Sequence, residues 1–298
     1  MKADIFALDG SKTKSMDIPE QFAEEYRPDL IRRVFLAFMS HARQPYGAFP
    51  EAGKRQVVNI PKRRRALKTS YGHGIARTPR KIVWHRGRQF GWVGAFSPNT
   101  PGGRRAHPPK PWKIYDLKIN IKERRKAIRS ALAATLDQEV VKERGHEFKH
   151  LIPIVDAKIE SLQKAKEVIQ TLHALHLETE LTRVGKRKIR AGKGKRRGRR
   201  YKTKKGPLIV VSESCPLQKA AASIPGVEIC EVNKLNINLL APGGDAVRFT
   251  IFSEKAMDKI KQEQLFMNAR TVAQKETAKK ETPKVAPKAK PQEKKAKQ

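Results

Sequence analysis

The sequence predicts an α/β fold with a mostly parallel sheet, because short apolar runs alternate with segments of helical periodicity. Four runs have the length and composition of buried strands: 151–155 (LIPIV), 208–211 (LIVV), 227–232 and 247–252. Between the first two, apolar residues recur at helical spacing over 162–175. Buried strands that alternate with helices are typical of a parallel sheet with helices on both faces.

The N-terminal part predicts a hairpin and a first long helix. Residues 3–8 and 15–18 flank Gly10, which indicates a short β-hairpin. Pro28 suits the first turn of a helix, where its missing N–H costs nothing, and apolar residues follow at helical spacing over 30–39. We therefore expect a hairpin followed by an amphipathic helix.

A second long helix is predicted to begin after Asn120. Asn120 can cap its N-terminus, and Glu123 stands at the third helical position. The apolar stripe continues from Ile128 to Val140, and Gly145 stops it. The pattern predicts one uninterrupted helix over this stretch.

The positive charge of the chain is concentrated in three segments. The 298 residues carry 65 Lys and Arg against 29 Asp and Glu, a net charge of +36. Segments 46–113, 183–206 and 275–298 hold 39 basic and four acidic residues, which leaves 26 basic and 25 acidic residues elsewhere. We therefore predict a nearly neutral globular domain, residues 1–45 and 114–265, with basic appendages and a polyanionic partner.

The insertion at 46–113 separates the two predicted long helices. It contains nine of the 19 Gly, eight of the 19 Pro and all three Trp, with 16 basic residues and one acid, Glu51. So long a segment without regular structure is uncommon in a compact domain, so we expect it to be disordered or held by something outside the domain. Its rings can stack on unpaired bases and its arginines can bind phosphates, which favours an extended loop threaded through RNA over a flexible basic arm.

The segment 183–206 carries 14 basic residues and no acid, with glycines every few residues. Glycine lets a backbone approach phosphates closely, and the charge binds phosphates regardless of sequence. Because a predicted helix precedes the segment and a strand follows it, we interpret it as an internal RNA-binding segment and not as a tail or localisation signal. Residues 266–298 form a Lys-, Pro- and Ala-rich tail that we expect to be disordered in isolation.

Other functional classes lack their motifs. Cys215 and Cys230 stand apart from any CxxC or His-rich motif, so we predict buried thiols and no metal site. The sequence contains no run of 18 apolar residues and no apolar run directly after Met1–Asp4, so we expect a cytoplasmic protein without membrane association. The turns after the predicted strands are not glycine-rich and no GxSxG elbow occurs, so we predict neither a cofactor nor catalytic residues, although an RNA-modifying enzyme with such a sheet is conceivable.

Three motifs stand out in chain order. They are GGRRAHPPK at 102–110, the segment RRKAIRSALAAT at 124–135 in the second predicted helix, and IRAGKGK at 189–195 with RGRRY at 197–201. Together they resemble the L-four family of large-subunit ribosomal proteins in its archaeal and eukaryotic form. The resemblance covers roughly residues 1–265.

Membership of this family implies a Rossmann-like globular domain and a long loop that runs through large-subunit RNA to the peptide exit tunnel. The loop tip would form part of the tunnel wall, beside protein L-twenty-two and the nascent polypeptide. The family's tip motif, Gly-x-Gly-Arg-Ala-Arg, aligns with residues 72–77, where Ile75 replaces the first arginine. The predicted tip comprises Tyr71, Gly72, His73, Gly74, Ile75, Ala76 and Arg77.

The resulting prediction is a structural constituent of the large ribosomal subunit that binds and organises its RNA. The predicted RNA-binding residues are Lys54, Arg55, Lys62, Arg63, Arg64, Arg65, Lys68, Arg77, Arg80, Lys81, Trp84, Arg86, Arg88, Trp92, Arg104, Arg105, His107, Lys110, Lys186, Arg187, Lys188, Arg190, Lys193, Lys195, Arg196, Arg197, Arg199, Arg200, Tyr201 and Lys202. The alternative is a basic nucleic-acid chaperone or DNA-compacting protein, which the charge alone permits. Such proteins usually lack a neutral α/β core interrupted by a Trp-bearing loop.

Overall fold

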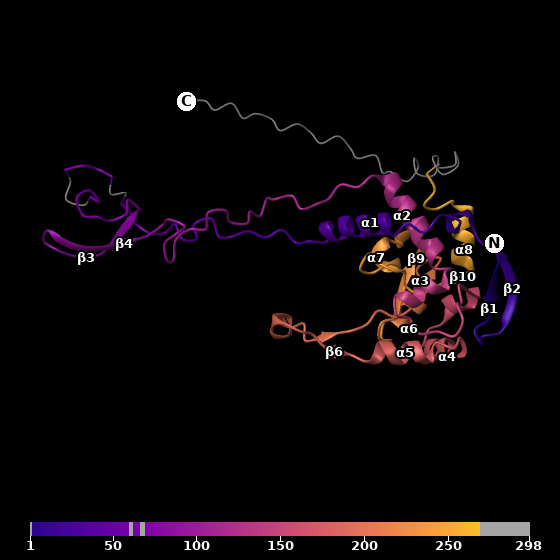
Figure 1. The fold of residues 1–298 in the computed structure, drawn as a ribbon. Helices are drawn as coiled ribbons and strands as arrows, with labels where there is room; N and C mark the ends of the chain where they lie inside the picture. Colours follow the sequence, from indigo (N-terminus) through magenta and orange to yellow (C-terminus); the bar gives the residue numbers. More distant parts are fainter. Residues whose placement is uncertain (1, 60–61, 66–68, 269–298) are drawn as a thin grey trace, which may run out of the picture. The chain divides into compact units, whose positions relative to one another are not determined.

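The computed structural model of the chain describes residues 2–59, 62–65 and 69–268 (Figure 1). These residues fall into two units. The globular unit draws on Met1–Met39 and Leu117–Gln298, and the loop unit is Ser40–Asp116. The limits predicted for the insertion, residues 46 and 113, lie inside the loop unit.

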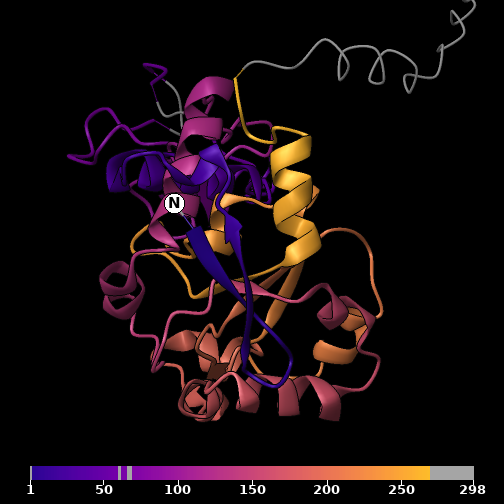
Figure 2. The ribbon, with the colours of Figure 1, turned by 90° about the vertical axis from the view of Figure 1, so that its right-hand side faces the viewer.

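A six-stranded sheet organises the globular unit. In spatial order its strands are β2 (Lys12–Asp17), β1 (Lys2–Phe6), β5 (Ile154–Val155), β10 (Thr250–Ser253), β8 (Leu208–Val211) and β9 (Glu228–Glu231). Neighbouring strands are parallel except β1 and β2, which form the predicted N-terminal hairpin, drawn in indigo in Figure 2. The mostly parallel sheet confirms the predicted fold class.

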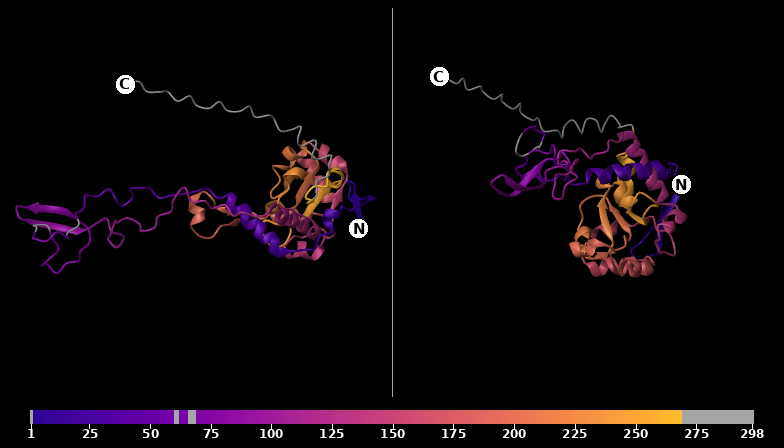
Figure 3. Two further views of the ribbon diagram at one scale, coloured as in Figure 1. Left: turned by 90° about the horizontal axis from the view of Figure 1, so that it is seen from above. Right: turned by 60° about the vertical axis from the view of Figure 1, so that its left-hand side comes forward.

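Helices connect these strands and cover both faces of the sheet. The α-helices are α1 (Pro28–His41), α2 (Ile121–Ala134), α3 (Gln138–Glu143), α4 (Ala165–Ala174), α5 (Glu178–Gly185), α6 (Leu217–Ala221), α7 (Ile237–Leu240) and α8 (Glu254–Gln262). The 3-10 helices are η1 (Glu20–Phe22), η2 (Ala157–Ser161), η3 (Lys193–Arg197) and η4 (Val232–Lys234). Figures 1 and 3 show α1 and α2 on one side of the sheet and α4 on the other.

Two further hairpins lie outside this sheet. In the loop unit, β3 (Arg80–Arg86) pairs with β4 (Gln89–Gly94). In the globular unit, β6 (Lys188–Ile189) pairs with β7 (Tyr201–Lys202). Both pairs are antiparallel, so each reverses the chain within a basic segment.

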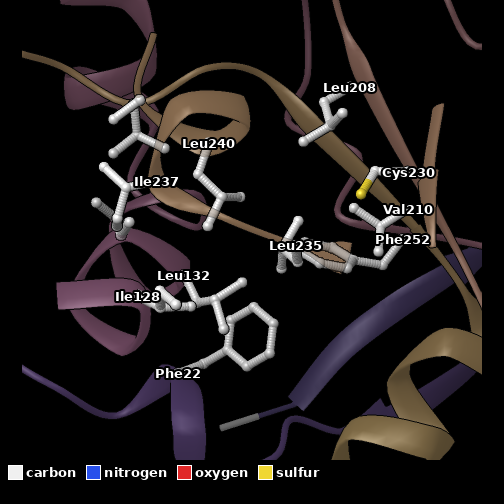
Figure 4. Close-up of a cluster of buried hydrophobic side chains, with 14 of the residues drawn as sticks. Phe22, Ile128, Leu132, Leu208, Val210, Cys230, Leu235, Ile237, Leu240 and Phe252 are labelled. Carbon is white, nitrogen blue, oxygen red and sulfur yellow. The ribbon is translucent and has the colours of Figure 1, made fainter. Parts of the chain in front are cut away.

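Apolar side chains alternate along the strands between two buried layers. Leu208 belongs to the layer that includes residues of α1 and α2, whereas Ile209 belongs to the layer that includes residues of α4 and α6. Figure 4 shows the first layer, in which the Phe22 and Phe252 rings meet edge to face with centroids 5.4 Å apart. Strands buried on both faces explain why the sequence shows continuous apolar runs.

The two cysteines differ in their surroundings. Cys230 is buried in the first apolar layer, as predicted, and burial raises the pKa of its thiol to about 11. Cys215 is only half-buried, which corrects the prediction of a second buried thiol. It lies in the loop after β8, where the chain leaves the core.

The predicted long helix after Asn120 is two helices. The Thr135 hydroxyl donates to Leu132 O at 2.6 Å as α2 ends, and the Asp137 carboxylate accepts from Glu139 N at 3.0 Å and caps α3. These local side-chain bonds interrupt a stripe whose periodicity alone predicted continuity. Asn120 occupies the N-cap position of α2, as predicted, but its side chain makes no cap hydrogen bond.

Two predicted strands are shorter than their apolar runs. Residues 151–155 contribute only β5, because Pro153 has no N–H for the ladder. Residues 247–252 contribute β10 only from Thr250 onward, because Arg248 N donates to Leu240 O at 2.8 Å and not to a neighbouring strand.

A buried polar network holds the two ends of segment 186–205 together. The Glu180 carboxylate in α5 accepts hydrogen bonds from Arg183 at 2.6 and 2.7 Å and from His146 Nδ1 at 2.7 Å. Arg183 also donates to Lys205 O at 2.8 Å. The helix before the segment is thereby tied to the residue that ends it.

Arg248 holds the turn at Gly206 and Pro207, directly after segment 186–205. Its side chain is fully buried, and a buried cation without partners would be strongly destabilising. Its guanidinium donates to the Gly206 and Pro207 carbonyls, to Gly226 O at 2.9 Å and to the Glu228 carboxylate at 2.5 Å. These bonds hold the start of β8.

We predict that the globular unit folds without most of the loop unit. All residues of the two apolar layers come from the globular unit, so a short Gly/Ser linker in place of residues 48–110 should leave them intact. Calorimetry in low salt should then show a cooperative thermal transition, with the full chain as control. A chain without such a transition would show that the insertion contributes to the core.

We predict that Glu180→Gln lowers the free energy of unfolding by about 3–5 kcal/mol, as expected when one partner of a buried ion pair is removed. Burial would raise the pKa of Glu180, but hydrogen bonds from Arg183, His146 and the Glu147 amide outweigh it and lower the pKa to about 2. This stabilisation is present above the ordinary pKa of 4.5 and is lost as the pH falls towards 2.

Denaturant titrations between neutral pH and pH 2 measure this difference. The matched control is Glu178→Gln, because Glu178 lies in the same helix with its side chain 67% exposed. The control should unfold like the parent at neutral pH. Equal losses of unfolding free energy in the two variants would show that the buried network stabilises the fold no more than an exposed carboxylate does.

Candidate RNA-binding surfaces

Residues 186–205, here called the basic hairpin, form an ordered turn. The strands β6 and β7 pair, and Gly192 and Gly198 adopt positive φ of 75° and 77° on either side of η3. Arg190 closes the turn, because its N–H donates to Arg200 O at 2.8 Å and its Nε to Arg199 O at 3.1 Å. Arg190 therefore shapes the hairpin as well as adding charge to it.

The other predicted residues of the basic hairpin point to solvent. The exposed members are Lys186, Arg187, Lys188, Lys193, Lys195, Arg196, Arg197, Arg199, Arg200, Tyr201 and Lys202. Ile189 pairs directly with Tyr201, and both side chains are exposed, so the ribbon has an apolar patch on one face and Lys188 with Lys202 on the other. Exposed Ile189 is a candidate contact that the sequence reasoning missed.

Intramolecular contacts hold the outgoing and returning parts of the loop unit together. Ala48 N donates to Pro109 O at 3.0 Å, and a methyl group on Gly53 would lie 2.5 Å from Gly103 O. So close an approach of two backbones requires glycine at position 53. A methyl group on Gly103 would lie 1.9 Å from Ser97 O, so this glycine of the 102–110 motif also has a structural role.

Aromatic residues add to this contact. The Tyr46 and Tyr115 rings stack with centroids 6.2 Å apart, and the Arg43 guanidinium lies 4.1 Å from the Tyr115 ring centroid. These contacts, together with the β3–β4 hairpin, correct the expectation that the insertion has no regular structure of its own. The sequence reasoning missed the contacts between the outgoing and returning parts because they join residues 50 to 72 positions apart.

The predicted tip is a turn. Gly72 and Gly74 have positive φ of 78° and 63°, as the reversal requires, and His73 is exposed between them. The Tyr71 ring is flanked by Arg77, at 4.7 Å from its centroid, and by Arg64 at 5.4 Å. The structure also contains a second reversal, at Gly87 between β3 and β4, which the sequence reasoning did not predict.

The remaining predicted residues of the loop unit separate into three groups. The exposed residues are Lys54, Arg55, Lys62, Arg63, Arg64, Arg65, Arg77, Trp84, Arg86, Arg88, Arg105, His107 and Lys110. Half-buried are Arg80, Lys81, Trp92 and Arg104. Lys68 lies outside the described residues, as does nearly all of the predicted tail. Arg55 already pairs with Glu51 at 2.7 Å, so it is a weaker phosphate ligand than its neighbours.

The crevice at the carboxyl ends of β5, β8 and β10 is where such sheets usually hold a ligand. Here a carboxylate of the chain lies in it. Glu160 accepts from Ser212 N at 2.8 Å, from the Ser212 hydroxyl at 2.9 Å and from the Ser253 hydroxyl at 2.5 Å. The crevice therefore carries an anion of the chain itself, which would repel a second anion.

The described residues contain neither a metal-binding cluster nor a membrane-spanning helix. Within residues 2–59, 62–65 and 69–268, no group of three or more His, Cys, Asp and Glu side chains is placed to bind a metal ion. Across the same ranges no helix combines the length and the apolar composition that crossing a membrane requires.

Comparison with known proteins places the chain in a family. Residues 16–263 match the model of the ribosomal protein L4/L1 family. The chain is 48% identical over 267 residues to the large ribosomal subunit protein uL4 of Nanoarchaeum equitans, covering 89% of this chain and 100% of that protein.

Two further relatives carry the same description. The uL4 protein of Methanocaldococcus jannaschii is 44% identical over 266 residues, 88% of this chain and 99% of the relative. That of Archaeoglobus fulgidus is 42% identical over 260 residues, 87% and 97% of the two chains. The family is structural and non-enzymatic, which settles the choice against an enzyme. With the family model and full-length relatives in agreement, the chain belongs to the ribosomal protein L4/L1 family.

Proposed function

We propose that this protein is a structural constituent of the large ribosomal subunit that binds and organises its RNA in the cytoplasm. The observation that carries the proposal is the arrangement of charge. The basic hairpin and the loop unit expose most of their Lys and Arg side chains, while the sheet domain is close to neutral. A polyanion with closely spaced phosphates is the partner that such surfaces fit.

The two surfaces are suited to different parts of an RNA. The basic hairpin presents guanidinium groups around a glycine-rich turn, which can fit closely against a phosphate backbone. The loop unit interleaves arginines with aromatic rings, a combination suited to unpaired bases. We therefore propose that the basic hairpin contacts folded RNA helices and the loop unit contacts irregular RNA.

We further propose that the tip, residues 71–77, forms part of the wall of the peptide exit tunnel. Support comes from its glycine turn and from the match of the chain to its family. His73 is exposed at the turn, and the Arg77 guanidinium lies over the Tyr71 ring. The neighbours implied there are the nascent polypeptide and protein L-twenty-two.

Replacing four arginines of the basic hairpin should reduce the salt dependence of RNA binding. If the parent neutralises roughly eight phosphates, its affinity for large-subunit RNA should fall by about 10³- to 10⁵-fold between about 50 and 200 mM salt. Changing Arg196, Arg197, Arg199 and Arg200 to Ala removes four exposed cations, so the slope of log affinity against log salt should fall by about 2 to 4 units.

Filter binding or fluorescence anisotropy over a salt series measures the slope. The matched control changes Lys166, Lys219, Lys255 and Lys261 to Ala, four exposed lysines outside both surfaces, and should leave it nearly unchanged. A slope that stays at the parent value in the arginine variant would show that the basic hairpin does not face RNA phosphates.

Deleting residues 72–76 should change the tunnel and not RNA affinity. The tip contributes a single exposed cation, Arg77, next to the deletion, so assembly and RNA affinity should stay near parental values. Purified ribosomes carrying the deletion should respond differently to arrest peptides or tunnel-directed inhibitors. The reciprocal control deletes residues 193–197, which should weaken RNA binding instead. Parental stalling and inhibitor binding in the tip deletion would contradict the tunnel assignment.

A further inference from the structure

The β3–β4 hairpin has two faces, which its register assigns. Residues directly opposite in an antiparallel pair point to the same side of the ribbon. Ile82 pairs with Trp92, and Trp84 pairs with Gly91 after a bulge at the intervening residue. The first face carries Arg80, Ile82, His85, Phe90 and Trp92, and the second carries Lys81, Trp84, Arg86, Gln89, Gly91 and Val93.

Contacts within the hairpin occupy the first face. The Phe90 and Trp92 rings meet edge to face at 5.1 Å between centroids. The Arg80 guanidinium lies 5.6 Å from the Trp92 ring centroid, and Arg80 Nη2 donates to Ala76 O at 3.0 Å. Phe90 and Trp92 are both half-buried, so this face serves the packing of the hairpin.

The second face presents one tryptophan ring laid against the backbone. A methyl group on Gly91 would lie 2.2 Å from Trp84 Nε1 and within 2.8 Å of two carbons of the same ring, so the ring covers the position where other residues have a side chain. Trp84 is nevertheless 56% exposed. One side of the ring therefore contacts the strand while the rest is open to a ligand.

Cations flank this ring on the same face. Lys81 and Arg86 occupy the second face on either side of Trp84 along β3, and Gln89 opposes Arg86. Segment 46–113 contains a single acid, Glu51, so a phosphate meets little repulsion here. An apolar protein partner would leave both cations without partners, which makes a nucleic-acid ligand the better fit.

We propose that Trp84, supported by Gly91, is a stacking site for one unpaired RNA base, with Lys81 and Arg86 contacting the phosphates on either side. The proposal rests on the proposed function and names the ligand of this part of the surface. A base paired within a duplex is stacked on its neighbours and cannot lie on the ring, so the site selects single-stranded RNA. Trp92, although equally aromatic, is a packing residue.

Fluorescence of single-tryptophan variants of the full chain tests the site, because the protein contains three tryptophans, Trp84, Trp92 and Trp112. The variant Trp92→Phe/Trp112→Phe reports on Trp84 alone, and Trp84→Phe/Trp112→Phe reports on Trp92. The probes are a single-stranded oligouridine, an RNA duplex of equal phosphate number and inorganic polyphosphate. We expect oligouridine to quench Trp84 strongly, the duplex and polyphosphate to quench it weakly, and Trp92 to respond weakly to all three.

Two substitutions then measure the contribution to affinity. Stacking on an aromatic ring corresponds to about a 5- to 150-fold change in affinity per base, so Trp84→Leu should weaken oligouridine binding by about tenfold at fixed salt. Gly91→Ala keeps the tryptophan but adds the methyl group that displaces its ring, and should reduce the quenching of Trp84. Neither change removes a charge, so the salt dependence should stay parental.

The outcomes separate this proposal from the wider one. Salt-dependent RNA binding with equal quenching by polyphosphate, or with parental affinity in Trp84→Leu, overturns the stacking site and leaves RNA binding intact. Absence of any binding to large-subunit RNA by the parent chain overturns both. If Trp84→Leu fails to fold, the Gly91→Ala variant and the fluorescence of the Trp84-only variant still decide the question.

Discussion

Like charges cannot be buried together, and this constraint organises the whole molecule. A net charge of +36 would disrupt any single core of this size, so the chain keeps its sheet domain nearly neutral and concentrates its excess positive charge in segments that contribute no residue to the apolar layers. The apolar layers on both faces of the sheet contain few ionisable groups. The same constraint leaves most of the described cations of the basic segments exposed to solvent.

The buried polar groups of the globular unit serve the basic hairpin. Glu180 and Arg183 join the helix before it to Lys205 after it, and Arg248 holds the turn that follows. A buried ion pair adds little net stability compared with apolar packing. It does define how the bonded segments are positioned, because few other groups can satisfy each donor. The two ends of the basic hairpin are therefore held in place, although its own surface is almost entirely polar.

The sheet resembles those that bind nucleotides, yet its usual ligand crevice contains a carboxylate of the chain. Glu160 accepts hydrogen bonds from Ser212 and Ser253 there. An enzymatic fold and a structural protein can thus share one architecture, because function depends on the side chains at the crevice. In this chain the surfaces proposed to bind RNA lie on the basic hairpin and the loop unit.

The sequence by itself determined the fold class, the strands at 208–211 and 227–232, the hairpin around Gly10 and the basic segments, because burial and charge leave local patterns of apolar and ionised residues. Tertiary structure decided what those patterns do not encode. The break at Thr135 depends on hydroxyl and carboxylate bonds that periodicity ignores. The contact of Gly53 with Gly103 and the Glu180 network join residues far apart in the chain, and only the folded backbone brings their atoms within bonding distance.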